Sequence, residues 1–232
     1  MKTVLARRGH VASTLNPMEG NVQLNGHPEL RFLSYIYSVG GPQNESVAAY
    51  FTGPPNDGSA WMVARSTSYV KGPQQAPSVE ATITDLQNRF GPASFDSARY
   101  SPVPGSRRLM WVWRVDGRKV SSPRSDPQDP CAFVARQLSQ SGIAVGRISN
   151  PPNAAATYNQ AIFDSANRGG CDVIYEVNLI STNGVVTTIR ATAANLKSAQ
   201  ASYERTRTLS DQLTARKREE ALRGANAVRP DL

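Results

Sequence analysis

The chain has 232 residues, enough for one large domain or two small ones with a buried core. Charged residues make up 19% and aromatic residues 7% of the chain, a composition that argues against a charge-driven disordered protein. No apolar run reaches the ~18 residues of a membrane-spanning helix. With two histidines and two cysteines, we expect neither a finger-type zinc site nor another metal site.

The chain is basic, with 26 Lys and Arg against 18 Asp and Glu and a net charge of +8. Between residues 99 and 124, seven basic residues accompany a single acid. We call these seven the basic band: Arg99, Arg107, Arg108, Arg114, Arg118, Lys119 and Arg124. Because a basic surface attracts anionic groups, we predict that five of them bind a partner or anion, namely Arg107, Arg108, Arg114, Arg118 and Lys119. The alternative is a solvated strand edge whose cations prevent edge-to-edge pairing.

The first 26 residues predict a flexible segment without regular structure. Residues 1–6 begin as a signal peptide does, but Arg7, Arg8 and His10 interrupt the apolar stretch. We therefore expect no usable export signal in this segment.

Three short strands are predicted next, over 29–39, 46–52 and 60–70, from alternating apolar residues separated by turn residues. Their close connections favour an antiparallel meander. Residues 79–90 then predict an amphipathic helix, because one apolar stripe recurs at helical spacing. Ser78 is the expected N-cap, and Gly91 followed by Pro92 predicts the end of this helix.

Apolar residues alternate again over 109–115, and an Asp-Gly pair predicts a hairpin turn after this strand. Trp111 and Trp113 share one face, which favours a core position for both. Stacking against single-stranded nucleic acid is the alternative, because Arg108 and Arg114 flank them. If the tryptophans are in the core, Arg114 points the other way and needs only solvent.

The last part of the chain predicts a short helix over 131–140, a long loop with at most one helical turn over 148–170, and a hairpin. The hairpin strands span 171–181 and 185–192 around Asn183-Gly184. Residues 196–223 contain neither glycine nor proline and predict a long polar helix. We expect three segments: a flexible 1–26, an α+β domain over 27–193, and a C-terminal helix and tail over 194–232.

Motifs that carry known chemistry are missing from the sequence. There is no phosphate-binding loop, dinucleotide fingerprint or nucleophile elbow, and we predict no cofactor and no catalytic residue. Ser68 to Lys71 match an S-x-x-K string, but they lie at the end of a predicted strand, whereas that chemistry needs a helix start. His10 and His27 lie in the N-terminal region, and neither indicates a general base.

Cys131 and Cys171 are the two cysteines of the chain. They either form one disulfide that closes roughly 40 residues, or are two unrelated buried thiols of a cytosolic protein. The residues alone leave both interpretations open.

Several short motifs follow one another along residues 45–232: the strand end at Arg65 to Tyr69, Asn88-Arg89-Phe90-Gly91-Pro92, Trp111-x-Trp113-x-x-Asp116-Gly117, Asp129-Pro130-Cys131, Gly170-Cys171, and the ending Arg229-Pro230-Asp231-Leu232. In this order they resemble a group of uncharacterised secreted or periplasmic proteins of Gram-negative bacteria. The resemblance implies an envelope location and a Cys131–Cys171 bridge, and it implies no activity.

We therefore predict an α+β protein with an antiparallel sheet of five to seven strands, the amphipathic helix 79–90 on one face, and a long polar C-terminal helix. The predicted function is that of a non-enzymatic periplasmic or secreted protein that binds a protein partner or an anionic polymer through the basic band. The alternatives are a hydrolase assembled from scattered residues, a nucleic-acid-binding protein, and a cytoplasmic location.

Overall fold

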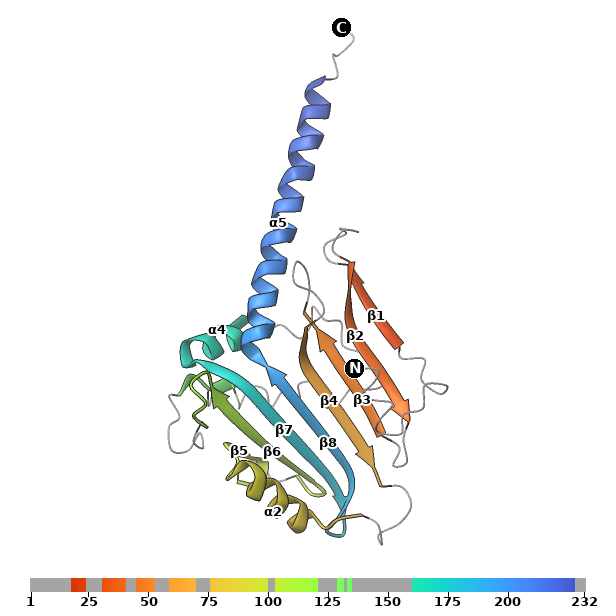
Figure 1. Ribbon diagram of the computed structural model, residues 1–232, viewed down its shortest axis with the longest axis vertical. Coiled ribbons are helices and arrows are strands. Elements are labelled where there is room, and N and C mark those ends of the chain that lie inside the picture. Colours follow the sequence, from red (N-terminus) through yellow and green to blue (C-terminus); the bar gives the residue numbers. More distant parts are fainter. Residues whose placement is uncertain are drawn as a thin grey trace.

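The computed structural model describes residues 18–23, 31–40, 45–52, 59–69, 76–99, 103–120, 129–131, 133–134 and 160–227. These residues form an α+β fold around one antiparallel sheet, as predicted (Figure 1). The eight strands lie in the order β1-β2-β3-β4-β8-β7-β6-β5. Their bounds are β1 Met18–Gln23, β2 Arg31–Gly40, β3 Glu45–Phe51, β4 Ala60–Ser68, β5 Phe95–Asp96, β6 Ser106–Arg114, β7 Cys171–Thr182 and β8 Val185–Asn195. The helical elements are α2 Val79–Phe90, a 3-10 turn η2 over Ser97–Arg99, α4 Gln160–Gly169 and α5 Leu196–Ala227.

The meander predicted from three strands is confirmed, because β2, β3 and β4 pair in sequence order. The sheet nevertheless has more strands than predicted. The segment predicted to be flexible contains β1, which pairs with β2 from Met18 opposite Tyr37. Strand β1 is held by its backbone hydrogen bonds to β2. The sequence of a short segment gives little indication of such pairing, so β1 was not predicted.

Helix α2 begins and ends where the sequence predicts. The Ser78 Oγ accepts a hydrogen bond from the backbone N–H of Ala81 at 3.1 Å. At the other end Gly91 adopts a φ of +71°, and its N–H donates to the carbonyl of Gln87 at 2.7 Å. The helix packs Ile83 onto one face of the sheet, which we call the α2 face.

Both faces of the sheet carry a core, because strands β6 and β7 are apolar at odd and even positions alike. On the α2 face, four buried side chains meet Ile83, namely Leu109, Trp111, Val177 and Leu179. On the opposite face, which we call the α5 face, Met110 and Val112 join a larger cluster that includes α4, the start of α5 and Cys131. Alternate residues of one strand therefore belong to two different layers.

Helix α4 lies where the sequence predicts a long loop. It buries Ser165 and Ala166 against the α5 face, and such small side chains give little apolar periodicity. The predicted helix over 131–140 is helical at Cys131, Phe133 and Val134, and its remaining residues lie outside the described part of the chain.

The hairpin β7–β8 is confirmed. Asn183 and Gly184 have φ angles of 52° and 77°, as a two-residue turn with both central residues in the left-handed region requires. Strand β6 ends at Arg114, one residue earlier than predicted, and Val115 lies exposed in the following turn.

Helix α5 has 32 residues and projects away from the sheet (Figure 1). Its first half buries one side against the body of the protein, through Leu196, Ala199, Ser202, Thr206 and Ser210. From residue 211 to 224, every side chain except the half-buried Leu213 is exposed. No helix among the described residues is long and apolar enough to cross a membrane.

Candidate functional site

Each of the five basic residues predicted to bind a partner contacts another part of the protein. Arg107 pairs with Asp96 at 2.8 Å and Arg108 with Glu176 at 3.1 Å. The acids come from β5 and β7, outside the window of residues 99–124 in which the charge was counted. The sequence excess of positive charge is therefore partly balanced in the folded protein.

The remaining three cations have partners of different exposure. Arg118 pairs with Asp116 at 2.7 Å in the open, where their side chains are 79% and 48% exposed. Lys119 donates from its Nζ to the carbonyl oxygens of Phe90 at 3.0 Å and Pro92 at 2.7 Å, so it caps the end of α2. Partial burial lowers the pKa of Lys119 below its ordinary value. A binding role for the basic band stays a prediction.

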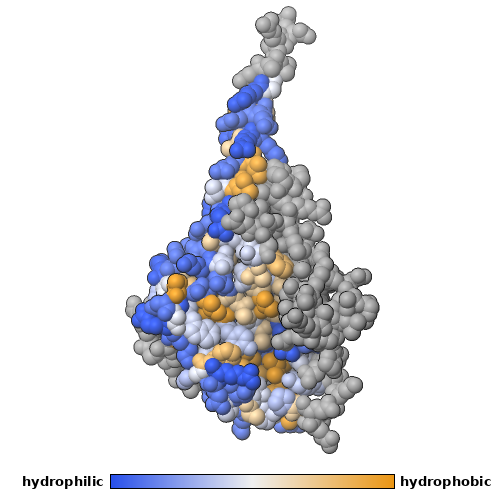
Figure 2. Space-filling model, in the orientation of Figure 1, coloured by the Kyte–Doolittle hydropathy of each residue, from blue (hydrophilic) through white to orange (hydrophobic). Residues whose placement is uncertain are grey.

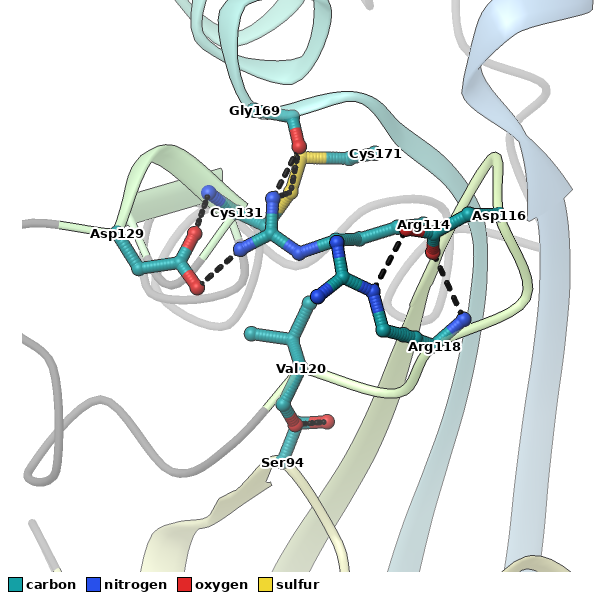
Figure 3. Close-up of polar contacts among 9 residues, drawn as sticks. All are labelled: Ser94, Arg114, Asp116, Arg118, Val120, Asp129, Cys131, Gly169 and Cys171. Atoms are coloured by element: carbon teal, nitrogen blue, oxygen red, sulfur yellow. Dashed lines mark hydrogen bonds and ion pairs between the residues drawn. A yellow bond between two sulfur atoms is a disulfide. The ribbon is translucent and has the colours of Figure 1, made fainter.

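If the tryptophans lie in the core, Arg114 is predicted to need only solvent. In the structure its guanidinium contacts other parts of the protein instead. Its Nη2 lies 2.5 Å from the Asp129 carboxylate, and its Nη1 donates to the Gly169 carbonyl (Figure 3). The same Nη1 lies 3.5 Å from the sulfur of Cys131. Asp129 in turn accepts the backbone N–H of Cys131 at 2.8 Å. The guanidinium thus connects β6 to the segments on both sides of the cysteine pair.

Cys131 and Cys171 form the disulfide that the resemblance implies, with an S–S distance of 2.00 Å and Cα atoms 5.7 Å apart. Both cysteines are buried. A Cβ added at Gly169 would lie 2.8 Å from the Cys131 sulfur, so this position has no space for a side chain. A buried bridge of this kind is typical of proteins that fold in an oxidising compartment.

The two tryptophans of β6 have different environments. Trp111 is fully buried, and its Nε1 donates to the carbonyl of Gly91 at 2.8 Å. Trp113 is half-buried and lies beside Phe90 and Tyr175. The arginines that flank them in sequence, Arg108 and Arg114, occupy alternate positions of β6 and make their contacts on the α5 face.

The half-buried rings of Phe90, Trp113 and Tyr175 form an aromatic cluster above Trp111. The ring centroids of Phe90 are 5.0 Å from Tyr175, 5.6 Å from Trp111 and 6.3 Å from Trp113. Tilted and edge-to-face contacts between aromatic rings at these distances are favourable, so the rings hold one another in a defined orientation. Burial raises the pKa of Tyr175, while the nearby guanidinium groups of Arg65 and Arg89 act in the opposite direction.

This cluster borders an open depression of about 480 Å³ on the α2 face. A second depression of about 220 Å³ shares Val173 and Ala193 with the first and extends to Val63 on β4. We call the two together the aromatic groove, lined among others by Phe90, Trp113, Asp172, Val173, Tyr175, Ala193, Val63, Asn195 and one residue of the basic band, Arg114. Figure 2 shows hydrophobic side chains gathered over the middle of the sheet, with hydrophilic residues to the left of them and below.

Strand register explains why residues far apart in sequence meet in this groove. Trp113 pairs with Val173, and Tyr175 pairs with Ala193, which in turn pairs with Val63. Helix α2 covers the neighbouring positions of the same face, and its last residue, Phe90, packs beside Trp113 and Tyr175. No local sequence pattern links β4, α2, β6 and β7, so the sequence does not predict the groove.

Glu176 is a buried carboxyl on the opposite side of the sheet. Burial raises its pKa to about 7, and the Arg108 guanidinium acts against this shift. Its Oε1 lies 3.1 Å from the Arg108 Nε but has no hydrogen-bond partner, and neither has the Oγ1 of Thr192, its paired residue on β8. Glu176 lines neither depression of the aromatic groove.

The described residues contain no group of three or more His, Cys, Asp or Glu side chains that could hold a metal ion. His10 and His27 lie outside the described part of the chain, as does Lys71 of the S-x-x-K string. Ser68 ends strand β4 rather than starting a helix.

Fold and site thus define an α+β protein with a buried disulfide and an open, aromatic-lined groove on its sheet. Comparison with known protein families, curated proteins and solved structures gave no match.

Proposed function

We propose that the chain is a non-enzymatic periplasmic or secreted protein that binds a component of the cell envelope through the aromatic groove. The observation that carries the proposal is the group of half-buried rings, Phe90, Trp113 and Tyr175, at the edge of an open depression. Aromatic side chains held in place at a concave surface are typical of binding sites. The Cys131–Cys171 bridge supports an oxidising compartment.

The groove is a better candidate than the basic band that the sequence analysis favoured. Cations such as Arg107 and Arg114 would have to leave buried or half-buried acids to bind an external anion, and leaving a buried carboxylate unpaired is costly. The rings of the groove, in contrast, can accept a ligand without breaking an ion pair.

The test is co-sedimentation of the purified full-length protein with cell-envelope fractions of its own organism, in wild type and two variants. We expect Trp113→Ala to reduce the sedimented fraction severalfold and Arg118→Glu to leave it unchanged. Loss of binding in Arg118→Glu with full binding in Trp113→Ala would return the function to the basic band. Leu222→Ala, an exposed change on α5 far along the chain from the groove, is the control for handling losses.

Location is tested separately, by mass spectrometry of the protein isolated from its native cell with and without reductant. The expected result is a linked Cys131–Cys171 pair. Free thiols would contradict the proposed compartment.

A further inference from the structure

We infer that the ligand of the aromatic groove is a glycan chain, an inference that rests on the proposed function of the groove. The rings, the polar groups beside them and the shape of the depression support this ligand class. A protein partner is the competing class of occupant, and the experiment below separates the two.

The rings provide stacking surfaces for sugar rings. Pyranose rings carry C–H groups on their faces, and these apolar faces stack on aromatic side chains. Trp113 and Tyr175 both contact Phe90, at centroid distances of 6.3 and 5.0 Å, which fixes all three before a ligand arrives. A preorganised surface loses little conformational entropy on binding.

Polar groups that suit hydroxyl groups lie at both parts of the groove. Asp172 lines the larger depression and provides carboxylate acceptors. Asn195 lines the smaller one, and its Oδ1 accepts the backbone N–H of Ser198 at 2.7 Å. This bond orients the Asn195 amide so that its nitrogen is the remaining donor. Sugar hydroxyls both donate and accept, so a carboxylate and an amide N–H match them.

The shape favours a chain over a compact ligand. The two depressions meet at Val173 and Ala193 and cross the sheet from β6 to β4, three strand spacings or about 14 Å. Both are open to solvent, so one extended ligand can lie across the two. A standard protein interface covers about 800 Å² per partner with a continuous apolar centre. Here Asp172 and Asn195 add one polar side chain to the lining of each depression.

The experiment is isothermal titration calorimetry of the full chain with two tetrasaccharides, one of β-1,4-linked N-acetylglucosamine and one of β-1,4-linked glucose. We expect at least one of them to bind. Trp113→Ala should weaken this binding by about tenfold or more, which corresponds to about 1.4 kcal/mol. Trp113→Phe should retain part of it, and Leu222→Ala all of it.

Asp172→Asn keeps the inference testable if Trp113→Ala does not fold, because this change removes the charge of a half-buried side chain and nearly preserves its shape. It should also weaken binding. Failure of both tetrasaccharides to bind, or binding that neither Trp113→Ala nor Asp172→Asn affects, would overturn the inference. If no sugar binds while envelope co-sedimentation still depends on Trp113, the proposed function stands with a different occupant, such as a protein.

Discussion

At the scale of single residues, Arg114 shows how much one side chain can connect. Its guanidinium contacts Asp129, the Gly169 carbonyl and the Cys131 sulfur, and the Asp129 side chain is only 10% exposed. Arg114→Met would leave that carboxylate without its cation, so we expect a loss of about 2 kcal/mol in the free energy of unfolding. Urea unfolding measures it.

Arg118→Met is the matched control for this prediction, because the Arg118–Asp116 pair on the same hairpin is open to solvent. Its removal should leave the free energy of unfolding unchanged. Equal losses in the two variants would show that the burial of Asp129 has no influence.

Glu176 predicts a dependence of stability on pH. Its folded pKa of about 7 lies above the ordinary value of 4.5, so the folded protein binds this proton more tightly than the unfolded chain does. The stabilisation is complete below about pH 4.5 and is lost as the pH rises to about 7, by up to about 3 kcal/mol. Glu176→Gln should flatten the free energy of unfolding between pH 5 and 8 and raise it at pH 8.

The control for Glu176→Gln is Glu220→Gln on the exposed part of α5, which should leave the pH profile as in wild type. An unchanged profile in Glu176→Gln would mean that another group causes any slope that wild type shows.

At the scale of elements, the end of α2 depends on a close fit between a glycine and a lysine. A Cβ at Gly91 would lie 2.7 Å from the Lys119 Nζ, whereas a Cβ at Gly117 meets nothing within 4 Å. Both glycines have positive φ, and Gly91, with a ψ of −172°, lies in a region that is essentially restricted to glycine, so its change to alanine costs about 1–3 kcal/mol from the backbone alone. We expect Gly91→Ala to cost more than Gly117→Ala, partly from this backbone strain and partly because the new Cβ displaces Lys119 from the carbonyls that it caps.

Urea unfolding followed by tryptophan fluorescence tests this comparison. Lys119→Met should lower stability by itself, since two hydrogen bonds are lost, and should remove the part of the Gly91→Ala cost that the Lys119 contact causes. A cost of Gly91→Ala that is the same in the wild-type and Lys119→Met backgrounds would contradict the expected contact.

Elements with strong local signals were predictable from sequence. Helix α2 has a cap residue, an apolar stripe and a stop, and the β7–β8 turn has an Asn-Gly pair whose conformation few other residues adopt. Strand β1 and helix α4 were not predicted. Pairing with β2 holds β1, and α4 packs through small side chains, and neither leaves a clear pattern in the local sequence. The groove was missed for a related reason: Trp113, Tyr175 and Val63 become neighbours only through register, which long-range pairing determines.

At the scale of the whole molecule, the disulfide joins Cys131 to Cys171 at the start of β7, 40 residues further along the chain. In the chain-entropy model such a bridge contributes about 4 kcal/mol to stability. We expect the double variant Cys131→Ala, Cys171→Ala to lose about that much free energy of unfolding, measured by urea unfolding. Reductant should destabilise wild type equally and leave the variant unaffected; a wild type insensitive to reductant under unfolding conditions would contradict the prediction.

The projection of helix α5 determines how this helix unfolds locally. An isolated helix of about a dozen residues is marginal in water, because its first turn is costly to form. In α5 the half packed against the body through Leu196 and Ala199 already supplies that turn, and the outer half has only to extend it. Amide hydrogen exchange should therefore speed up gradually from residue 211 towards Ala227, without a step between two cooperative units. The last turns would stand about 25 Å beyond the packed half, a semi-rigid arm that melts from its tip inwards.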